Sequence, residues 1–215
     1  LFAALNGATV TGNLVVTITA DVTNEAGTNG LNGNTWTSIT INPSGARTIQ
    51  GTLAGAALIN LTGADNVTFN GLNTGGNSLT ISNLSTSATS GTATIRFGSD
   101  ATSNVITNCS VLGSSTMAVT TNGGNIFFHT GTTNGNDNNT ISNCNIGPAG
   151  TNLPTKGIYM NGSTTSTAIG NNSNLIINND IYDFFGGATT SAGIYVGTGS
   201  QDNTFSYNRF YQRAT

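Results

Sequence analysis

The chain has 215 residues, of which 36% are hydrophobic and only 6% are charged, and its net charge is −3. Five Lys and Arg residues are too few to form the basic surface that nucleic acid requires, so we expect no nucleic-acid partner. No run of about 18 apolar residues occurs, which predicts no membrane-spanning helix. The abundance of Gly, Asn, Thr and Ser, together with Val and Ile, favours strands and turns over helices.

The first elements are expected between residues 1 and 84. The spacing of Leu1, Phe2 and Leu5 suits a short amphipathic helix that caps the first strands. Strand-like runs follow at 13–22, 37–51, 66–72 and 77–84. We expect one β-helix domain over residues 1–215, with the N-terminal cap and first strands in 1–34 and the coils in 35–212. Because "YQRAT" directly follows a strand-like run, we also expect the sequence to be a fragment of a longer chain.

Two short segments recur along the rest of the chain in a constant order. The first reads "NVITNCSV" from Asn104, "NTISNCNI" from Asn139, "NLIINNDI" from Asn174 and "NTFSYNRF" from Asn203, at intervals of 35, 35 and 29 residues. The second precedes each of these and reads "TIRFGS" at 94, "NIFFHTG" at 125, "GIYMNGS" at 157 and "GIYVGTGS" at 193. Such units bury their apolar faces only by stacking on one another, which predicts a parallel β-solenoid.

The first segment predicts a corner in each coil. Its apolar residues are five apart, as in Ile141 and Ile146, so they cannot share one face of a straight strand. A corner between them lets both point inward. The sixth position is small in every copy, whereas the fifth position ends in Tyr207, which fits a narrow interior poorly. We therefore predict an inward structural stack of Cys109, Cys144, Asn179 and Asn208.

Cys109 and Cys144 are the two cysteines of the chain and lie one coil apart in this scheme. Stacked strands are about 4.8 Å apart, a Cα separation that a disulfide tolerates. Parallel Cβ directions suit a disulfide less well. We favour two stacked thiols, which behave as small buried hydrophobic groups.

The series "GADNVTFNGL", "TIRFGSDATSNVITNCSV", "NGNDNNTISNCNI" and "NTFSYNRFYQ" resembles the pectate-lyase-like β-helix repeats of large secreted or surface proteins of Bacteroidetes. The resemblance covers about residues 35–212. It implies an all-β fold, a right-handed, single-stranded parallel β-helix of the pectin-lyase-like type. It also implies export by a type IX system and an extracellular or cell-surface location. The superfamily contains lyases, hydrolases, adhesins and structural stalks, so the resemblance implies no single activity.

The acidic residues stand mainly at turn positions. Asp65, Asp137 and Asp202 lie in the turn before the first segment, and Asp100 lies four residues before Asn104. Carboxylates in turns accept hydrogen bonds from nearby backbone, whereas a hard cation requires several oxygen ligands converging on one point. We therefore predict turn-forming roles, no metal site and no cofactor.

Other candidates for catalysis are few. Asp180 and Asp183 are close enough in sequence to suggest a hydrolase pair, but Asp180 lies one coil from Arg209, and a cross-strand ion pair is the plainer interpretation. His129 is the only histidine and has no acidic or nucleophilic residue near it in the sequence or at the matching positions of other coils. The sequence therefore predicts no catalytic residue and favours a protein that is not an enzyme.

One row of residues suggests a binding site. If Ile95, Ile126, Ile158 and Ile194 point inward, the residues after them point outward. The predicted ligand-binding row consists of Arg96, Phe127, Tyr159 and Tyr195. Exposed aromatic side chains stack on sugar rings and usually mark a contact surface. The competing interpretation is that a return loop covers the row or that it stacks only on itself.

These observations favour a non-catalytic structural or adhesive segment of a secreted or cell-surface bacterial protein. Its expected partners are a polysaccharide or another surface protein, and its open last coil suggests end-to-end self-association. The alternative is a carbohydrate-binding or degenerate polysaccharide-active domain that uses the aromatic row. Scattered outward threonines argue against a third role, ice binding.

Overall fold

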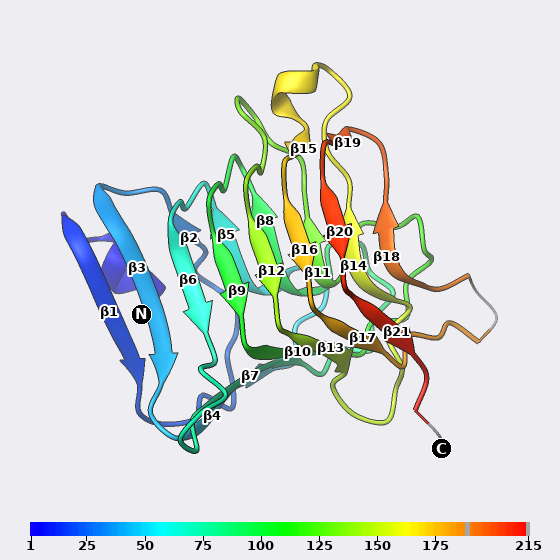
Figure 1. Cartoon of the computed structure of the whole chain (residues 1–215), viewed down its shortest axis with the longest axis horizontal. Coiled ribbons are helices and arrows are strands. Elements are labelled where there is room, and N and C mark those ends of the chain that lie inside the picture. Colours follow the sequence, from blue (N-terminus) through cyan, green and yellow to red (C-terminus); the bar gives the residue numbers. More distant parts are fainter. Residues whose placement is uncertain (188–189, 214–215) are drawn as a thin grey trace.

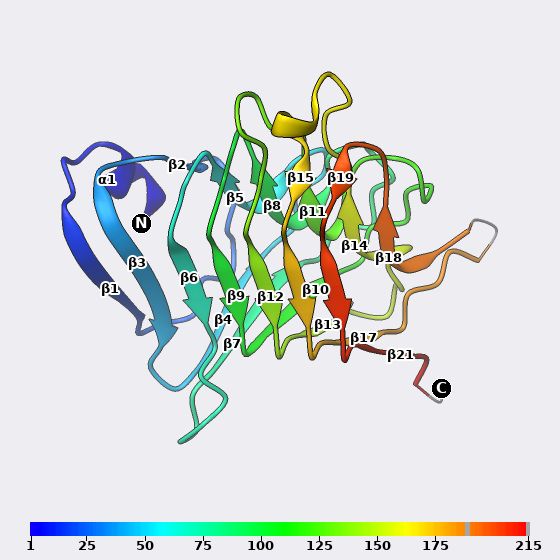
Figure 2. The ribbon, with the colours of Figure 1, turned by 45° about the horizontal axis from the view of Figure 1, so that its top comes forward.

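The computed structural model describes residues 1–187 and 190–213, and it is a parallel β-helix. Successive strands pass through sheet A, then sheet B, then sheet C, and each strand pairs in parallel with its counterparts in the neighbouring coils (Figures 1 and 2). The predicted fold class, an all-β, right-handed, single-stranded parallel β-helix with a short N-terminal helix, is confirmed.

Sheet A contains β1 (Gly12–Ile18), β3 (Trp36–Pro43), β6 (Val67–Asn70), β9 (Val105–Thr107), β12 (Thr140–Ser142), β16 (Leu175–Ile177) and β20 (Thr204–Ser206). Sheet B contains β4 (Ala46–Gly51), β7 (Ser78–Asn83), β10 (Cys109–Gly113), β13 (Asn145–Pro148), β17 (Asp180–Tyr182) and β21 (Arg209–Tyr211). Sheet C contains β2 (Leu31–Asn32), β5 (Ala57–Thr62), β8 (Ala93–Gly98), β11 (Gly124–Phe128), β14 (Lys156–Met160) and β18 (Ala192–Val196). The helix α1 (Phe2–Asn6), the 3-10 turn η1 (Thr167–Ile169) and the pair β15 (Asn171–Asn172) and β19 (Ser200–Gln201) complete the chain.

The corner between sheets A and B is made by one residue in the left-handed conformation. The fifth position of the repeated segment has φ between 54° and 56° in Asn108, Asn143, Asn178 and Tyr207. This conformation shifts the alternation of inward and outward side chains by one residue. As a consequence, the sixth residue points inward. Ile141 and Ile146 are both fully buried as a result, which explains their spacing of five.

Two ladders of side chains hold the coils together at the ends of sheet A. At the first position of the repeat, the backbone N–H of each Asn donates to the Oδ1 of the Asn in the next coil. These N···O distances are 2.9, 2.9 and 2.8 Å from Asn104 to Asn139 to Asn174 to Asn203. Each amide thus replaces a backbone partner that the bend removes.

The sixth position of the repeat forms the second ladder. The backbone N–H of Cys144 donates to Asn179 Oδ1 at 3.0 Å, and that of Asn179 donates to Asn208 Oδ1 at 3.0 Å. Cys109, Cys144 and Asn179 are buried, and Asn208 is half-buried in the last coil. Both cysteines are free thiols, and burial raises the pKa of Cys109 above its usual range and that of Cys144 to about 12. They act as packing groups.

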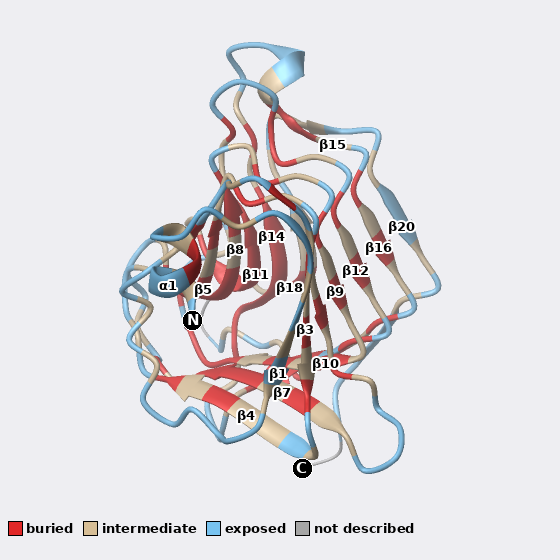
Figure 3. Ribbon diagram, turned by 90° about the vertical axis from the view of Figure 1, so that its left-hand side faces the viewer, coloured by how far each residue is buried: buried red, intermediate tan, exposed pale blue. Residues whose placement is uncertain are grey.

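The interior is filled by residues in register from coil to coil. Ile106, Ile141 and Ile176 align in sheet A, and the rings of Phe97 and Phe128 stack in sheet C with centroids 4.6 Å apart. In Figure 3, which views the solenoid from its N-terminal end, β8, β11 and β14 are coloured as buried. The unequal repeat intervals are therefore absorbed by loops, and the sheets stay regular.

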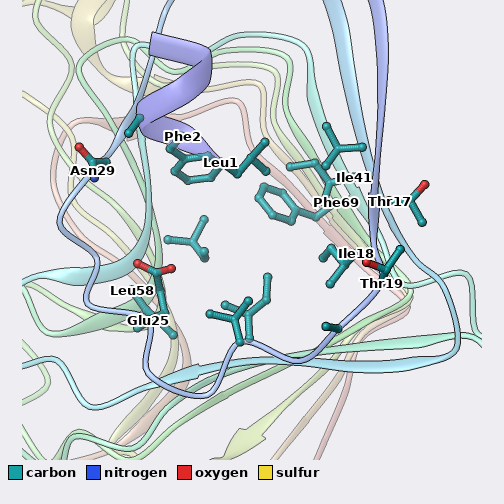
Figure 4. Close-up of a pocket in the computed structure, with 16 residues that line it drawn as sticks. Leu1, Phe2, Thr17, Ile18, Thr19, Glu25, Asn29, Ile41, Leu58 and Phe69 are labelled. Atoms are coloured by element: carbon teal, nitrogen blue, oxygen red, sulfur yellow. The ribbon is translucent and has the colours of Figure 1, made fainter. Parts of the chain in front are cut away.

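The N-terminal mouth of the solenoid is partly closed by α1. Leu5 is buried, and Leu1 and Phe2 line an apolar cavity of about 390 Å³ that also meets Leu58 and Phe69 (Figure 4). Glu25 stands at the edge of this cavity, where its carboxylate accepts the Gly27 N–H at 2.8 Å. The short helix thus covers the mouth but does not fill it.

Candidate functional site

The four residues of the predicted binding row lie side by side on the outside of sheet C. Arg96 pairs with Phe127, Phe127 with Tyr159, and Tyr159 with Tyr195, while Ile95, Ile126, Ile158 and Ile194 occupy the neighbouring inward positions. Asn60 extends the row by one coil beyond Arg96. The register of sheet C therefore brings together all four residues selected from the sequence.

Two members of the row are not exposed, which agrees with the competing interpretation that a loop covers the row. Phe127 is 0% and Tyr159 is 3% exposed, and both pack in a small cluster with Ala57 and Ala93. The loop 114–123 covers them, and the Tyr159 hydroxyl donates to the Thr120 carbonyl of this loop at 2.9 Å. Arg96 and Tyr195 are half-buried, so they offer the accessible surface of the row.

Lys156, which the sequence analysis did not select, fastens the same loop. It is the only lysine of the chain and is completely buried. Its Nζ donates to the carbonyls of Ala118 at 3.1 Å, Val119 at 3.3 Å and Thr121, and lies 4.2 Å from the Tyr159 ring centroid. The available signal was a lysine two residues before an inward Ile, at a position where the other coils have only the small residues Ala93, Gly124 and Ala192.

The charge of Lys156 makes stability depend on pH. Burial lowers the pKa of Lys156 from 10.5 to about 7. Between these values the unfolded chain binds a proton that the folded chain does not, so stability rises with pH from about 7 towards 10.5 and is lower below pH 7. We expect the melting temperature to increase between pH 6 and pH 9.

The matched control for this pH effect is Lys156→Met, which keeps the apolar stem and removes the titrating group. The variant is expected to show a much flatter dependence of melting temperature on pH. A wild-type chain whose melting temperature falls between pH 6 and pH 9, or a variant with the same slope as the wild type, would contradict the assignment.

The polar end of the row contains Arg96 and His129. Arg96 Nε donates to Asn60 Oδ1 at 2.9 Å, and the Phe127 ring meets the His129 ring edge-on at a centroid distance of 5.0 Å. Burial, and then the charge of Arg96, lowers the pKa of His129 below its usual range. The group is suited to hydrogen-bonding a hydroxyl or an anion, and it contains no carboxylate that would complete an acid–base pair.

The carboxylates are engaged in the framework of the coils. Asp100 accepts hydrogen bonds from the loop residues Thr132, Thr133, Asn134 and Gly135, and these outweigh the effect of burial and lower its pKa to about 2. Asp65 binds Thr102, and Asp137 accepts the N–H of Asn172 at 2.6 Å. The sequence predicted bonds within the turn of each Asp, but all three carboxylates instead bond residues 32 to 37 positions further along the chain, and so they join neighbouring coils.

The remaining acidic residues follow the same pattern. Asp180 and Arg209 form the predicted cross-strand ion pair, with Nε 2.6 Å from Oδ1. Asp183 binds Arg213, Asp21 accepts the N–H of Thr48, and Glu25 accepts that of Gly27. Asp202 alone accepts no hydrogen bond from the residues described. Within 1–187 and 190–213, no three His, Cys, Asp or Glu side chains gather in a way that would hold a metal ion.

The chain has only distant similarity to known proteins. No protein-family model matches the chain, and no curated protein matches it. Among solved structures, an alginate lyase from Paenibacillus sp. str. FPU-7 is 14% identical with a TM-score of 0.44, and the match covers 99% of this chain and 95% of that one. A pectin methylesterase from Aspergillus niger is 12% identical with a TM-score of 0.32, over 98% of this chain and 79% of that one.

Over the part of the chain that the structure describes, no helix has the length and apolar character needed to cross a membrane.

Proposed function

We propose that this chain is a non-catalytic structural or adhesive β-helix segment of a secreted or cell-surface bacterial protein. One observation carries the proposal: seven of its eight acidic side chains accept hydrogen bonds that join coils or close turns. A polysaccharide-active enzyme presents carboxylates to its substrate, whereas these carboxylates are bonded to other residues of the coils. A solenoid of this kind offers a long surface held by repeated contacts.

The proposed setting rests on the sequence resemblance. It comprises an origin in Bacteroidetes, export by a type IX system and an extracellular or cell-surface location. The proposed partners are a polysaccharide or another surface protein. End-to-end self-association is also proposed, through a coil in which Phe205 and Phe210 continue the columns of the buried Ile176 and Ile181.

The proposal is tested by incubating the purified chain with neutral and acidic polysaccharides and measuring new reducing ends and unsaturated chain ends. We expect no increase over a heat-denatured control. Turnover that disappears in Asp202→Asn or in His129→Ala would overturn the non-catalytic role, since these residues are the carboxylate without a described donor and the only histidine.

A second candidate is carbohydrate binding on the outside of sheet C. Arg96 and Tyr195 stay accessible at the two ends of the row and favour this role. The Tyr195 ring is held in place by stacking on the Tyr159 ring, with the two ring centroids 5.3 Å apart. Tyr195→Ala should then reduce binding on a glycan array. Tyr211→Ala, on sheet B, is the matched control and should leave the binding unchanged.

A further inference from the structure

An aromatic residue occupies a backbone position that suits asparagine. The fifth position of the repeat is left-handed in every coil, and it holds Asn108, Asn143, Asn178 and then Tyr207, with φ values of 56°, 54°, 56° and 55°. Asparagine tolerates this conformation because its short side chain bonds locally, whereas a bulky residue is strained in it. Tyr207 is therefore the unfavourable member of the series.

No packing within the described chain compensates for this strain. Tyr207 is 82% exposed, stacks on no other ring and makes no hydrogen bond through its hydroxyl to any residue in 1–187 or 190–213. The exposure belongs to the position itself, because Asn143 and Asn178 are also exposed although coils flank them on both sides. Residues held in strained conformations at a surface are a signal of function.

The Tyr207 ring borders a polar hollow on the outer side of the corner. The hollow has a volume of about 360 Å³ and spans three coils. Its polar lining consists of Asn143, Asn145, Asn178, Asp180 and Arg209. The three amides make no described side-chain hydrogen bonds, so their donors and acceptors are available to a ligand.

The charges in the hollow favour an uncharged ligand. Asp180 and Arg209 bind each other through two contacts, so an anion would have to compete with Asp180 for the guanidinium. An aromatic face beside amides and a paired carboxylate is the combination that holds a sugar ring, with the apolar face of the ring on the tyrosine and its hydroxyls on the polar groups. The volume is at the small end of the range of ligand sites, roughly 300–1,000 Å³.

We propose that the hollow beside Tyr207 binds an uncharged pyranose unit of a glycan. The hollow would be the binding site for the adhesive part of the proposed function, so this inference rests on that function. The site lies at the corner between sheets A and B, apart from the row on sheet C. Its loss leaves the non-catalytic framework untouched.

The test combines binding and stability in one substitution, Tyr207→Asn, which restores the residue found in the other three coils. The probes are uncharged oligosaccharides of glucose, mannose, galactose and N-acetylglucosamine. Their binding is followed by isotope-edited NMR of the side-chain amide signals. At least one probe should shift the side-chain amide signals of Asn145 and Asn178. Tyr207→Asn should weaken that binding by about tenfold or more. The same change should raise the melting temperature by about 2–4 °C, because it removes strain.

Three results would overturn the proposal. They are no amide shift with any probe, binding that Tyr207→Asn leaves intact, and binding that Tyr195→Ala removes while Tyr207→Asn does not. The last result would move the site to sheet C. Turnover of polysaccharide would overturn the non-catalytic role alone and would leave the Tyr207 site standing, so the two failures are distinguishable.

Discussion

Asn139→Ala is expected to lower the free energy of unfolding by about 2–6 kcal/mol, because it leaves two buried polar groups without partners at a cost of about 1–3 kcal/mol each. Asn139 Oδ1 accepts from the backbone N–H of Asn104 at 2.9 Å, and its Nδ2 donates to the Ala101 carbonyl at 3.0 Å. Both partners are buried, so water cannot replace the amide. Urea unfolding at constant m-value measures the effect.

Asn145→Ala is the matched control for Asn139→Ala. Asn145 is in the same coil, is exposed, and makes no described side-chain hydrogen bond. Its replacement should change the unfolding free energy by no more than about 0.5 kcal/mol. Equal effects of the two substitutions would show that the first-position amides do not hold the coils together.

Phe128→Ala is expected to cost about 3–5 kcal/mol of unfolding free energy, since it removes a fully buried ring and leaves a cavity. The Phe128 ring stacks on Phe97 with an interplanar angle of 15°, so the two residues should also be coupled. A double-mutant cycle with Phe97→Ala should give an interaction energy of about 0.5–1.5 kcal/mol.

Phe185→Ala is the control for the loss of an aromatic ring, because Phe185 is exposed. It is expected to have a much smaller effect than Phe128→Ala. Additive effects of Phe97→Ala and Phe128→Ala would mean that the stacking of the two rings contributes nothing beyond burial.

The repeat made the core of the fold predictable. An inward Ile and an outward residue alternate on sheet C, so the register of Arg96, Phe127, Tyr159 and Tyr195 follows from sequence once a solenoid is assumed. The inward sixth position followed from residue size in the same way. In both cases a local pattern is copied from coil to coil, and stacking removes the remaining freedom.

The repeat allowed the burial of Phe127 and Tyr159 under a return loop only as an alternative to an exposed row, and it did not show which loop covers them. Their cover is the loop 114–123. It differs in length and sequence from the corresponding connections 84–92 and 149–155 between sheets B and C, and it is held by contacts to its backbone carbonyls. Any residue can supply a backbone carbonyl, so the sequence does not show which residues accept these hydrogen bonds. It shows only the donors, Lys156 and Tyr159. The role of the first-position asparagines was not predictable either. The left-handed residue is the one before each of them, such as Ser103 or Asn138, and Asn139 itself is buried.

The two candidate surfaces differ in their relation to the repeat. The row on sheet C comes from periodicity and is half covered, whereas the hollow beside Tyr207 comes from a break in periodicity. A residue that departs from a repeat without gaining any packing is a stronger indication of an external contact than one that continues it.

The central claim is that the polar residues of this chain serve to join its coils. Native-state hydrogen exchange tests it directly, because the backbone N–H groups of Asn104, Asn139 and Asn174 are each bonded to a side-chain Oδ1 of the next coil. These amides should be among the slowest to exchange, and should open only with global unfolding, while the exposed loop 164–166 exchanges fast. Exchange of the three amides at the rate of that loop would contradict the account.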